Sequence, residues 1–240
     1  MRRRGILAAT AAGALLARGL RPARAEETVD VLLVLAVDVS RSVDEEEARL
    51  QREGYYAALT DPEIIALIRR GMLGAIGVAY VEWSGHDWQR LVVPWTRIGS
   101  AEEAAAWVEA LERHPPRAIG WTSISGAIDF SRRVLAEAPW QGMRRVIDIS
   151  GDGDNNSGPP AEQARDRAVA EGIVINGLPI MNAPHPGMRL PLDEYYRRNV
   201  IGGPGAFVIP TEDFHGFARA VRRKLVLEIA GRRGPGGAPA

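Results

Sequence analysis

The feature that most constrains the fold is a run of seven consecutive apolar residues, Val31 to Val37, which ends in Asp38. The run is too uniformly apolar for a strand with one face in water, so it predicts a central strand of a parallel sheet that is covered on both faces. Two hydroxyl residues, Ser40 and Ser42, follow Asp38 at alternate positions. Parallel sheets bind ligands at the carboxyl ends of their strands, where these oxygens could converge on a hard cation such as Mg²⁺.

Two later segments fit the same site. Gly120-Trp121-Thr122 opens a stretch with apolar residues at helical spacing, which predicts a helix that begins just after Thr122. A second strand-like run over 145–150 places Asp152 just past its end. If this strand is a parallel neighbour of the first, Asp152 lies beside Asp38 on the same rim of the sheet.

This arrangement resembles the metal-ion-dependent adhesion site (MIDAS) of the von Willebrand factor A domain family, written Asp-x-Ser-x-Ser, then a distant Thr, then an Asp. The matching residues are Asp38, Ser40, Ser42, Thr122 and Asp152. Within that family the chain is most similar, over roughly 29–230, to a secreted bacterial branch known as domain of unknown function DUF1194. The resemblance implies a doubly wound α/β fold and a metal-dependent module that binds protein.

The resemblance also implies how the ion is held. Ser40 and Ser42 would coordinate Mg²⁺ or Mn²⁺ directly, Thr122 directly or through water, and Asp38 and Asp152 mainly through water. Ca²⁺ is an alternative ion. One coordination position would stay open for an Asp or Glu of a partner protein.

Two other functions use the same ion. A metal-assisted hydrolase would polarise a substrate or activate water with it, and a scaffold of a periplasmic complex would use it structurally. The chain has no Gly-x-Ser-x-Gly elbow, Walker loop or His-Glu-x-x-His motif, and no cysteine. Its histidines fall on expected loops and helix ends, so we expect no catalytic residue; they are His86, His114, His185 and His215.

Three local features have competing explanations. Ser and Asp are favoured helix caps, but Asp38 lies too early to cap the helix expected from residue 44, whereas Ser42 could serve both as a ligand and as a cap. Asp148 interrupts a buried strand, which predicts a pairing Arg or a position near the sheet edge, with a second metal site as the alternative. The loop 152–158 carries Asp152, Asp154 and Asn156 like the opening of a calcium loop, or forms a turn that supports the main site.

The remaining pattern alternates strands and helices and predicts one domain over 29–230. We expect a mostly parallel sheet of about six strands with helices on both faces and one antiparallel edge strand, which tolerates Pro94. Strands are expected over 31–37, 74–83, 91–98, 146–150, 173–179 and 206–209. Helices are expected over 44–59, 63–70, 101–113, the stretch after Thr122, 160–171, 193–200 and 213–230, followed by a disordered tail over 231–240.

The N-terminus resembles a signal peptide over 1–25, with three arginines, an apolar core too short for a permanent membrane span, and Ala-Arg-Ala before Glu26. Export to the periplasm or beyond the cell is therefore expected, by the general or the twin-arginine pathway. Removing its six arginines leaves 24 basic against 30 acidic residues, a net charge of −6. This acidic balance argues against nucleic acid as a partner.

Overall fold

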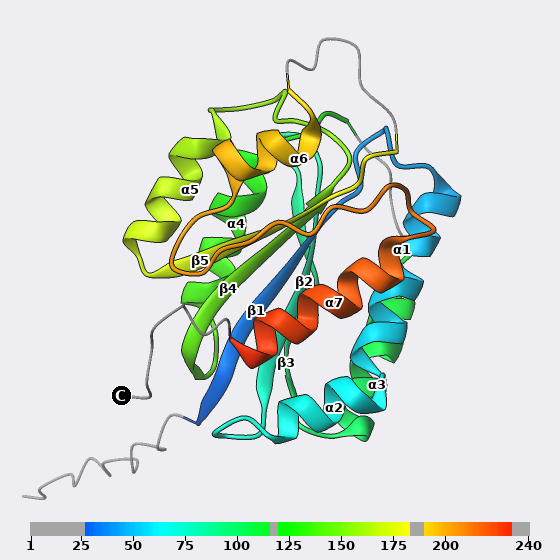
Figure 1. The fold of residues 1–240 in the computed structure, drawn as a ribbon, viewed down its shortest axis with the longest axis vertical. Helices are drawn as coiled ribbons and strands as arrows, with labels where there is room; N and C mark the ends of the chain where they lie inside the picture. Colours follow the sequence, from blue (N-terminus) through cyan, green and yellow to red (C-terminus); the bar gives the residue numbers. More distant parts are fainter. Residues whose placement is uncertain (1–26, 116–119, 183–189, 232–240) are drawn as a thin grey trace, which may run out of the picture.

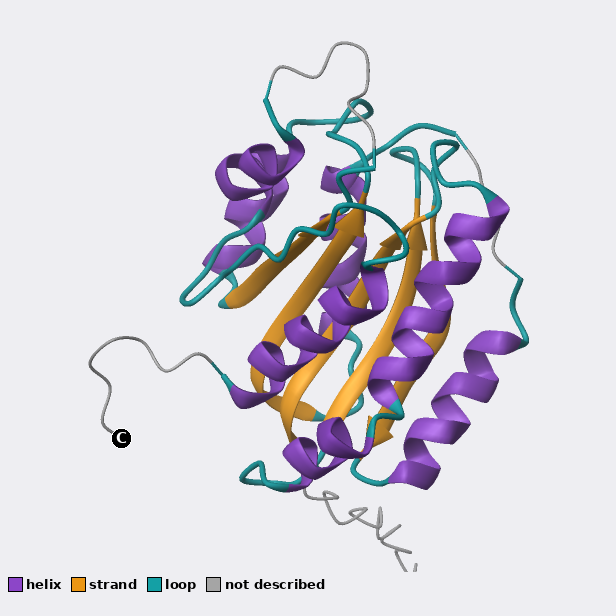
Figure 2. Cartoon of the chain, turned by 45° about the vertical axis from the view of Figure 1, so that its right-hand side comes forward, coloured by secondary structure: helices purple, strands orange, loops and turns teal. Residues whose placement is uncertain are grey.

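The computed structural model describes residues 27–115, 120–182 and 190–231. The predicted signal peptide and nearly all of the predicted tail lie outside these ranges. Within them the chain forms one five-stranded sheet in the order β3-β2-β1-β4-β5, with helices packed on both faces (Figures 1 and 2). The doubly wound α/β architecture expected from the sequence is confirmed, with five strands in place of about six.

The apolar run lies in the central strand, as predicted. β1 (Thr28–Asp38) pairs in parallel with β2 (Ile76–Trp83) on one side and with β4 (Gln141–Gly151) on the other. β5 (Ile173–Pro179) continues the parallel sheet beyond β4. β3 (Gln89–Ile98) is the antiparallel edge strand next to β2, and it carries Pro94 on an edge where a missing N–H costs no ladder bond.

Alternate residues of β1 enter two separate cores because successive strand side chains point to opposite faces. Leu33 and Leu35 face one core, and Val34 and Ala36 face the other. The first core is covered by α1 (Glu45–Leu59), α2 (Pro62–Arg69), α3 (Ala101–Glu112) and α7 (Phe217–Ala230). The second is covered by α4 (Ile124–Ala136), α5 (Ala161–Ala170) and α6 (Leu192–Tyr195), which continues as the π-helical segment Tyr196–Val200. None of the described helices is long and apolar enough to cross a membrane.

The cap of α1 differs from the expected one. Asp44 is the N-cap: its side chain accepts a hydrogen bond from the Glu47 N–H at 2.8 Å, and the Glu47 side chain accepts one from the Asp44 N–H at 2.9 Å. This reciprocal capping box fixes the first turn of the helix. The capping role considered for Ser42 is therefore wrong, and its hydroxyl is directed to other partners.

The sixth strand, expected over 206–209, is absent from the described sheet. Residues of this segment form isolated bridges, such as Gly177 with Val208, in place of a continuous ladder. The Phe207 N–H donates to the side-chain oxygen of Asn176 at 3.2 Å, and Pro179 of β5 has no N–H to donate to the segment, although Ile209 and Thr211 still donate to the Gly177 and Pro179 carbonyls. Because backbone pairing is interrupted at Phe207 and Pro179, the segment follows β5 without becoming a strand.

The last helix begins at Phe217, four residues later than expected. A turn precedes it, in which the Asp213 side chain accepts a hydrogen bond from the Gly216 N–H at 2.8 Å. Short Asp side chains favour such local bonds over the helical pattern.

Asp148 has a buried cationic partner, but not the one predicted. β4 lies inside the sheet, so a position near the edge is wrong, and the partner is Lys224 of α7 in place of an Arg. Lys224 also contacts Glu228 Oε1 at 2.7 Å, and both carboxylates and the ammonium are buried. Two carboxylates share one ammonium. Burial is the main cause that raises the pKa of Asp148 to about 7; the charge of Glu228 adds to it, while Lys224 opposes it.

This buried cluster predicts a pH dependence of stability. The pKa of Asp148 is higher in the folded chain than its ordinary 3.8, so the folded state keeps a proton that the unfolded chain releases. The contribution of Asp148 to stability is therefore fully present below about pH 4 and is lost as the pH rises to about 7, by at most about 4 kcal/mol. Asp148→Asn should flatten the decline in the free energy of unfolding, measured by denaturant titration between pH 5 and 8.

Asp61→Asn is the matched control, because a hydrogen bond from Arg222 lowers the pKa of Asp61, which therefore titrates below this pH range. An Asp148→Asn protein whose stability falls with pH as steeply as that of the wild type would contradict the prediction.

Candidate metal centre

The two carboxylates of the predicted site lie next to each other at one end of the sheet. Asp38 is the last residue of β1, and Asp152 follows the last residue of β4. The parallel register pairs Val37 with Ser150, so the two strands end at the same level. Both carboxylates are fully buried, at 0% exposure.

Three hydroxyls complete the cluster. The Ser42 hydroxyl donates to Asp152 Oδ1 at 2.7 Å and lies 3.0 Å from the Ser40 hydroxyl. The Thr122 hydroxyl donates to the Ser40 hydroxyl at 3.4 Å, and the Ser40 N–H donates to Asp38 Oδ1 at 2.8 Å. The structure thus brings together all five residues that the sequence analysis selected, in one connected set of oxygen atoms.

Thr122 is held in place by the loop that follows β4. Its N–H donates to the side-chain oxygen of Asn156 at 2.9 Å, and its carbonyl accepts from the N–H groups of Asn156 and Ser157. Ser123, not Thr122, caps α4, since its hydroxyl accepts from the Gly126 N–H. The Thr122 hydroxyl is therefore left to face Ser40.

The same contacts bear on the calcium-loop interpretation of 152–158. Oδ1 of Asn156 accepts from Thr122, and Oδ1 of Asp152 accepts from Ser42, so two of the three residues expected to bind calcium already use an oxygen elsewhere. Asn155 Oδ1 accepts from the Ser125 N–H at 3.0 Å. The loop therefore joins the end of β4 to the start of α4, which matches its expected supporting role.

The electrostatics of the cluster favour a bound cation. Burial, and then the charge of Asp152, raise the pKa of Asp38 well above its usual range, although the N–H of Ser40 opposes this. Oδ2 of Asp38 is buried and has no hydrogen-bond partner among the described residues. A carboxylate in this state is costly unless a positive charge neutralises it. The donor set fits a hard divalent cation, because it consists of two carboxylates and three hydroxyls, all oxygen.

Two residues that the sequence analysis did not select also shape the site. A Cβ atom at Gly151 would lie 2.8 Å from Asp38 Oδ2, so only glycine lets β4 pass the carboxylate at this point. The Tyr196 hydroxyl donates to the Gly151 carbonyl at 3.5 Å. The pKa of Tyr196 is raised by burial and then by the charges of Asp38 and Asp152. The glycines on either side of Asp152 could have indicated from the sequence that the chain packs closely here. No sequence feature near Tyr196 indicated that it contributes to the site.

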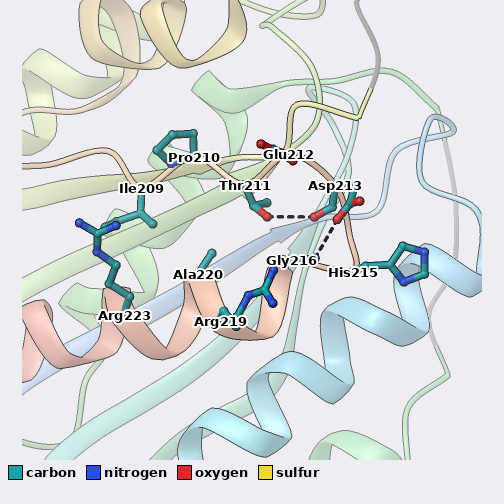
Figure 3. Close-up of a pocket in the computed structure, with 10 residues that line it drawn as sticks. All are labelled: Ile209, Pro210, Thr211, Glu212, Asp213, His215, Gly216, Arg219, Ala220 and Arg223. Atoms are coloured by element: carbon teal, nitrogen blue, oxygen red, sulfur yellow. Dashed lines mark hydrogen bonds between the residues drawn. The ribbon is translucent and has the colours of Figure 1, made fainter.

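A separate hollow of about 420 Å³ lies beside the N-terminus of α7 (Figure 3). Arg219, Arg223 and His215 line it together with Glu212 and Asp213. All five side chains are exposed, and none of the five predicted ligands lines the hollow. Within the described ranges, moreover, no group of three or more His, Asp or Glu side chains is arranged to hold a metal. The oxygen cluster is therefore the better candidate for a functional site.

The histidines occupy the kind of positions expected of them. His86, His114 and His215 are exposed, and His185 lies outside the described residues. None of the three exposed histidines has a hydrogen bond to the five clustered residues.

Comparisons with known proteins agree with the architecture. A family model described as a protein of unknown function, DUF1194, matches residues 28–233. Among curated proteins, none is significantly similar to the chain in sequence.

Several solved structures share the fold. A von Willebrand factor type A protein from Catenulispora acidiphila superposes with a TM-score of 0.59 at 17% identity, over 84% of this chain and 43% of its own. Proximal thread matrix protein 1 from the mussel byssus, with a zinc-occupied MIDAS motif, gives 0.58 at 17% identity over 84% and 46%. The pilus adhesin SpaC from Lactobacillus rhamnosus GG gives 0.61 at 15% identity over 85% and 31%. The chain thus spans less than half the length of each of these proteins.

The buried Asp38 predicts effects of opposite sign with and without metal. Without a divalent cation, Asp38→Asn should melt at or above the temperature of the wild type, because it removes a repelled, buried charge and keeps the acceptor for the Ser40 N–H. With Mg²⁺ or Mn²⁺ the wild type should gain about 2.7 kcal/mol at 100 times the dissociation constant, and the variant should gain nothing. Thermal melting in chelator and in excess metal measures both effects.

Asp152→Ala should also lose the gain with metal. Asp154→Asn, which changes a neighbouring carboxylate outside the cluster, should keep it. A wild type that melts at the same temperature in chelator and in either metal would contradict the assignment.

Proposed function

The chain belongs to the DUF1194 family, and from this premise we propose that it is an exported, metal-dependent protein-binding module. Its divalent cation, held by Asp38, Ser40, Ser42, Thr122 and Asp152, would coordinate an acidic residue of a partner protein. We propose Mg²⁺ or Mn²⁺ as the ion, with Ca²⁺ as the alternative. The von Willebrand factor A fold of the chain supports this proposal, as does the zinc-occupied MIDAS motif of the mussel protein.

The observation that carries the proposal is the uneven exposure of the cluster. Asp38 and Asp152 are at 0% exposure and Ser40 is at 1%, whereas Thr122 keeps 5% exposure and Ser42 is exposed. A cation in this cluster would be approached from the side of Ser42. This is the side from which a ligand of a partner protein can reach it.

The chemistry of the donors indicates which ligand would bind. Hydroxyl oxygens carry no charge, so an ion held directly by Ser40, Ser42 and Thr122, with Asp38 and Asp152 bound mainly through water, stays more electrophilic than one that carboxylates ligate directly. An incoming carboxylate is then attracted strongly, because the site is partly shielded from water. An Asp or Glu side chain of a protein supplies such a group, whereas neutral side chains do not.

The location is proposed from the N-terminus. The predicted signal peptide over 1–25 would direct the chain to the periplasm or beyond the cell. The likeness to a pilus adhesin is compatible with a role outside the cytoplasm, and the described helices include no membrane span.

We propose no enzymatic activity. A hydrolase would need a general base beside the ion, and none of the exposed histidines has a hydrogen bond to the clustered residues. The buried carboxylate of Asp38 is occupied by the Ser40 N–H on one oxygen and faces Gly151 with the other. The scaffold alternative uses the same ion without an open position and is distinguished by the experiment below.

Binding to carboxylates should depend on the metal. Peptides with one central Asp or Glu in a Gly-Ser background, displayed on an array, should retain the protein in Mg²⁺ or Mn²⁺ and release it in chelator. Matched peptides with Asn or Gln should not retain it, because a neutral amide is a weaker ligand for the ion. Thr122→Val should reduce retention at least about tenfold, since it removes one oxygen and keeps the shape of the side chain.

The controls separate the three functions. Ser157→Ala changes a hydroxyl outside the cluster and should retain the peptides as the wild type does. Metal stabilisation without any carboxylate-dependent retention would favour the scaffold. Turnover of p-nitrophenyl acetate or phosphate with Mn²⁺, lost in Asp152→Ala, would favour the hydrolase.

A further inference from the structure

Trp121 is the large apolar residue that the structure exposes beside the metal centre. It is 70% exposed and directly precedes Thr122, which is 5% exposed. Two other large apolar side chains of the described residues are more than half exposed, Met72 in the turn before β2 and Met143 near the start of β4, and both lie at the opposite end of the sheet. Tryptophan is enriched at protein interfaces, because it offers a large apolar surface whose burial is strongly favourable.

The backbone that carries this indole is held by hydrogen bonds on its C-terminal side. Gly120 adopts a left-handed conformation with φ of 76°, which sets the direction of the chain as it enters Trp121. Thr122 is held by Asn156 and Ser157, as described above, and the Ser123 N–H donates to the Ser84 carbonyl at 2.7 Å. A side chain on a well-held backbone loses little conformational entropy when a partner covers it. More of the free energy gained by burying its apolar surface therefore contributes to binding affinity.

Arg41 lies on the neighbouring loop, between Ser40 and Ser42. Its N–H donates weakly to the Gly120 carbonyl at 3.5 Å, which joins this loop to the one that carries Trp121. The Arg41 side chain is exposed and forms no ion pair within the described residues. We call these two exposed residues the Arg41–Trp121 rim. Both side chains are exposed, and each residue directly adjoins residues of the cluster in the chain, Arg41 between Ser40 and Ser42 and Trp121 before Thr122.

We propose that the Arg41–Trp121 rim selects the partner of the metal centre. The partner segment carries an acidic residue for the cation and, next to it, an aromatic or large aliphatic residue that packs on Trp121. Arg41 attracts the negative charge of this segment. The inference rests on the proposed function, since only an acidic residue bound at the cation brings the segment over the rim.

The two rim residues act through different forces. Packing on Trp121 removes apolar surface from water, and this contribution changes little with salt. The attraction of Arg41 is between exposed charges and is screened within about 8 Å at physiological ionic strength. Removal of Trp121 therefore lowers affinity at every salt concentration, whereas removal of Arg41 lowers it chiefly at low salt.

Fluorescence anisotropy with labelled peptides tests the inference on the full-length protein in Mg²⁺. The probes carry one Asp in a Gly-Ser background, with Phe immediately before it, with Phe immediately after it, or with no Phe. The wild type should bind one of the Phe peptides about tenfold more tightly than the peptide without Phe. Trp121→Ala should bind all three alike, and Trp121→Phe should keep part of the preference.

Arg41→Gln is tested with the same probes across a salt series. It should bind more weakly at low salt and show a shallower loss of affinity as salt rises. Arg70→Gln is the matched control, because it removes one exposed charge at the opposite end of the sheet, and Met72→Ala is the matched control for Trp121→Ala. Both controls should bind as the wild type does.

The outcomes separate this inference from the proposed function. Trp121→Ala should still be stabilised by Mg²⁺, because the indole is not among the five ligands. If the wild type binds Asp and Asn peptides equally, or binds in chelator, the proposed function fails and the rim inference fails with it. If binding needs Asp and Mg²⁺ but Trp121→Ala keeps the preference for Phe and Arg41→Gln keeps the full salt dependence, the rim inference alone is overturned.

Discussion

The structure depends on two buried carboxylates that meet where adjacent parallel strands end. Asp38 and Asp152 lie at the carboxyl ends of β1 and β4, and each is fully buried. Their mutual repulsion and their loss of water disfavour the metal-free state. Around them the chain supplies hydroxyls, a glycine that makes room, and a loop that fixes Thr122. These features hold an unfavourable arrangement in place, and a divalent cation would relieve it.

Other buried carboxylates of this chain are neutralised differently. Glu82, at the end of β2, is paired with Arg52 of α1 and Arg90 of β3. Asp148 and Glu228 share Lys224 of α7. No cation of the described chain lies against Asp38, although it is as deeply buried as they are. The contrast indicates that a missing protein cation at the end of β1 is a specific property of this site and not a general feature of the interior.

The sequence predicted those features that depend on neighbouring residues, and it did not predict those that depend on contacts between distant segments. The positions of Asp38 and Asp152 could be predicted because apolar runs indicate parallel strands, whose ends coincide. The position of Thr122 could be predicted because a glycine and a helical periodicity indicate the turn before α4. The buried position of Lys224 could not be predicted, since a single lysine in an amphipathic helix gives no sign that it is buried. The strand expected over 206–209 was wrong because a distant side chain, Asn176, takes the N–H that a ladder needs. Contacts between remote segments therefore account for most of what the sequence did not reveal.

The spacing of the ligands also explains why a rim exists beside them. Ser40 and Ser42 face the cluster at alternate positions, which leaves the residues between and before them outside it: Val39 is buried in the core, and Arg41 faces solvent. Trp121 is likewise next to a ligand without being one. Such neighbours are free of the chemical demands of the cation, so their side chains can vary without loss of the metal. The cation can therefore set the requirement for a carboxylate, while the adjacent exposed residues determine which carboxylate-bearing segment is preferred.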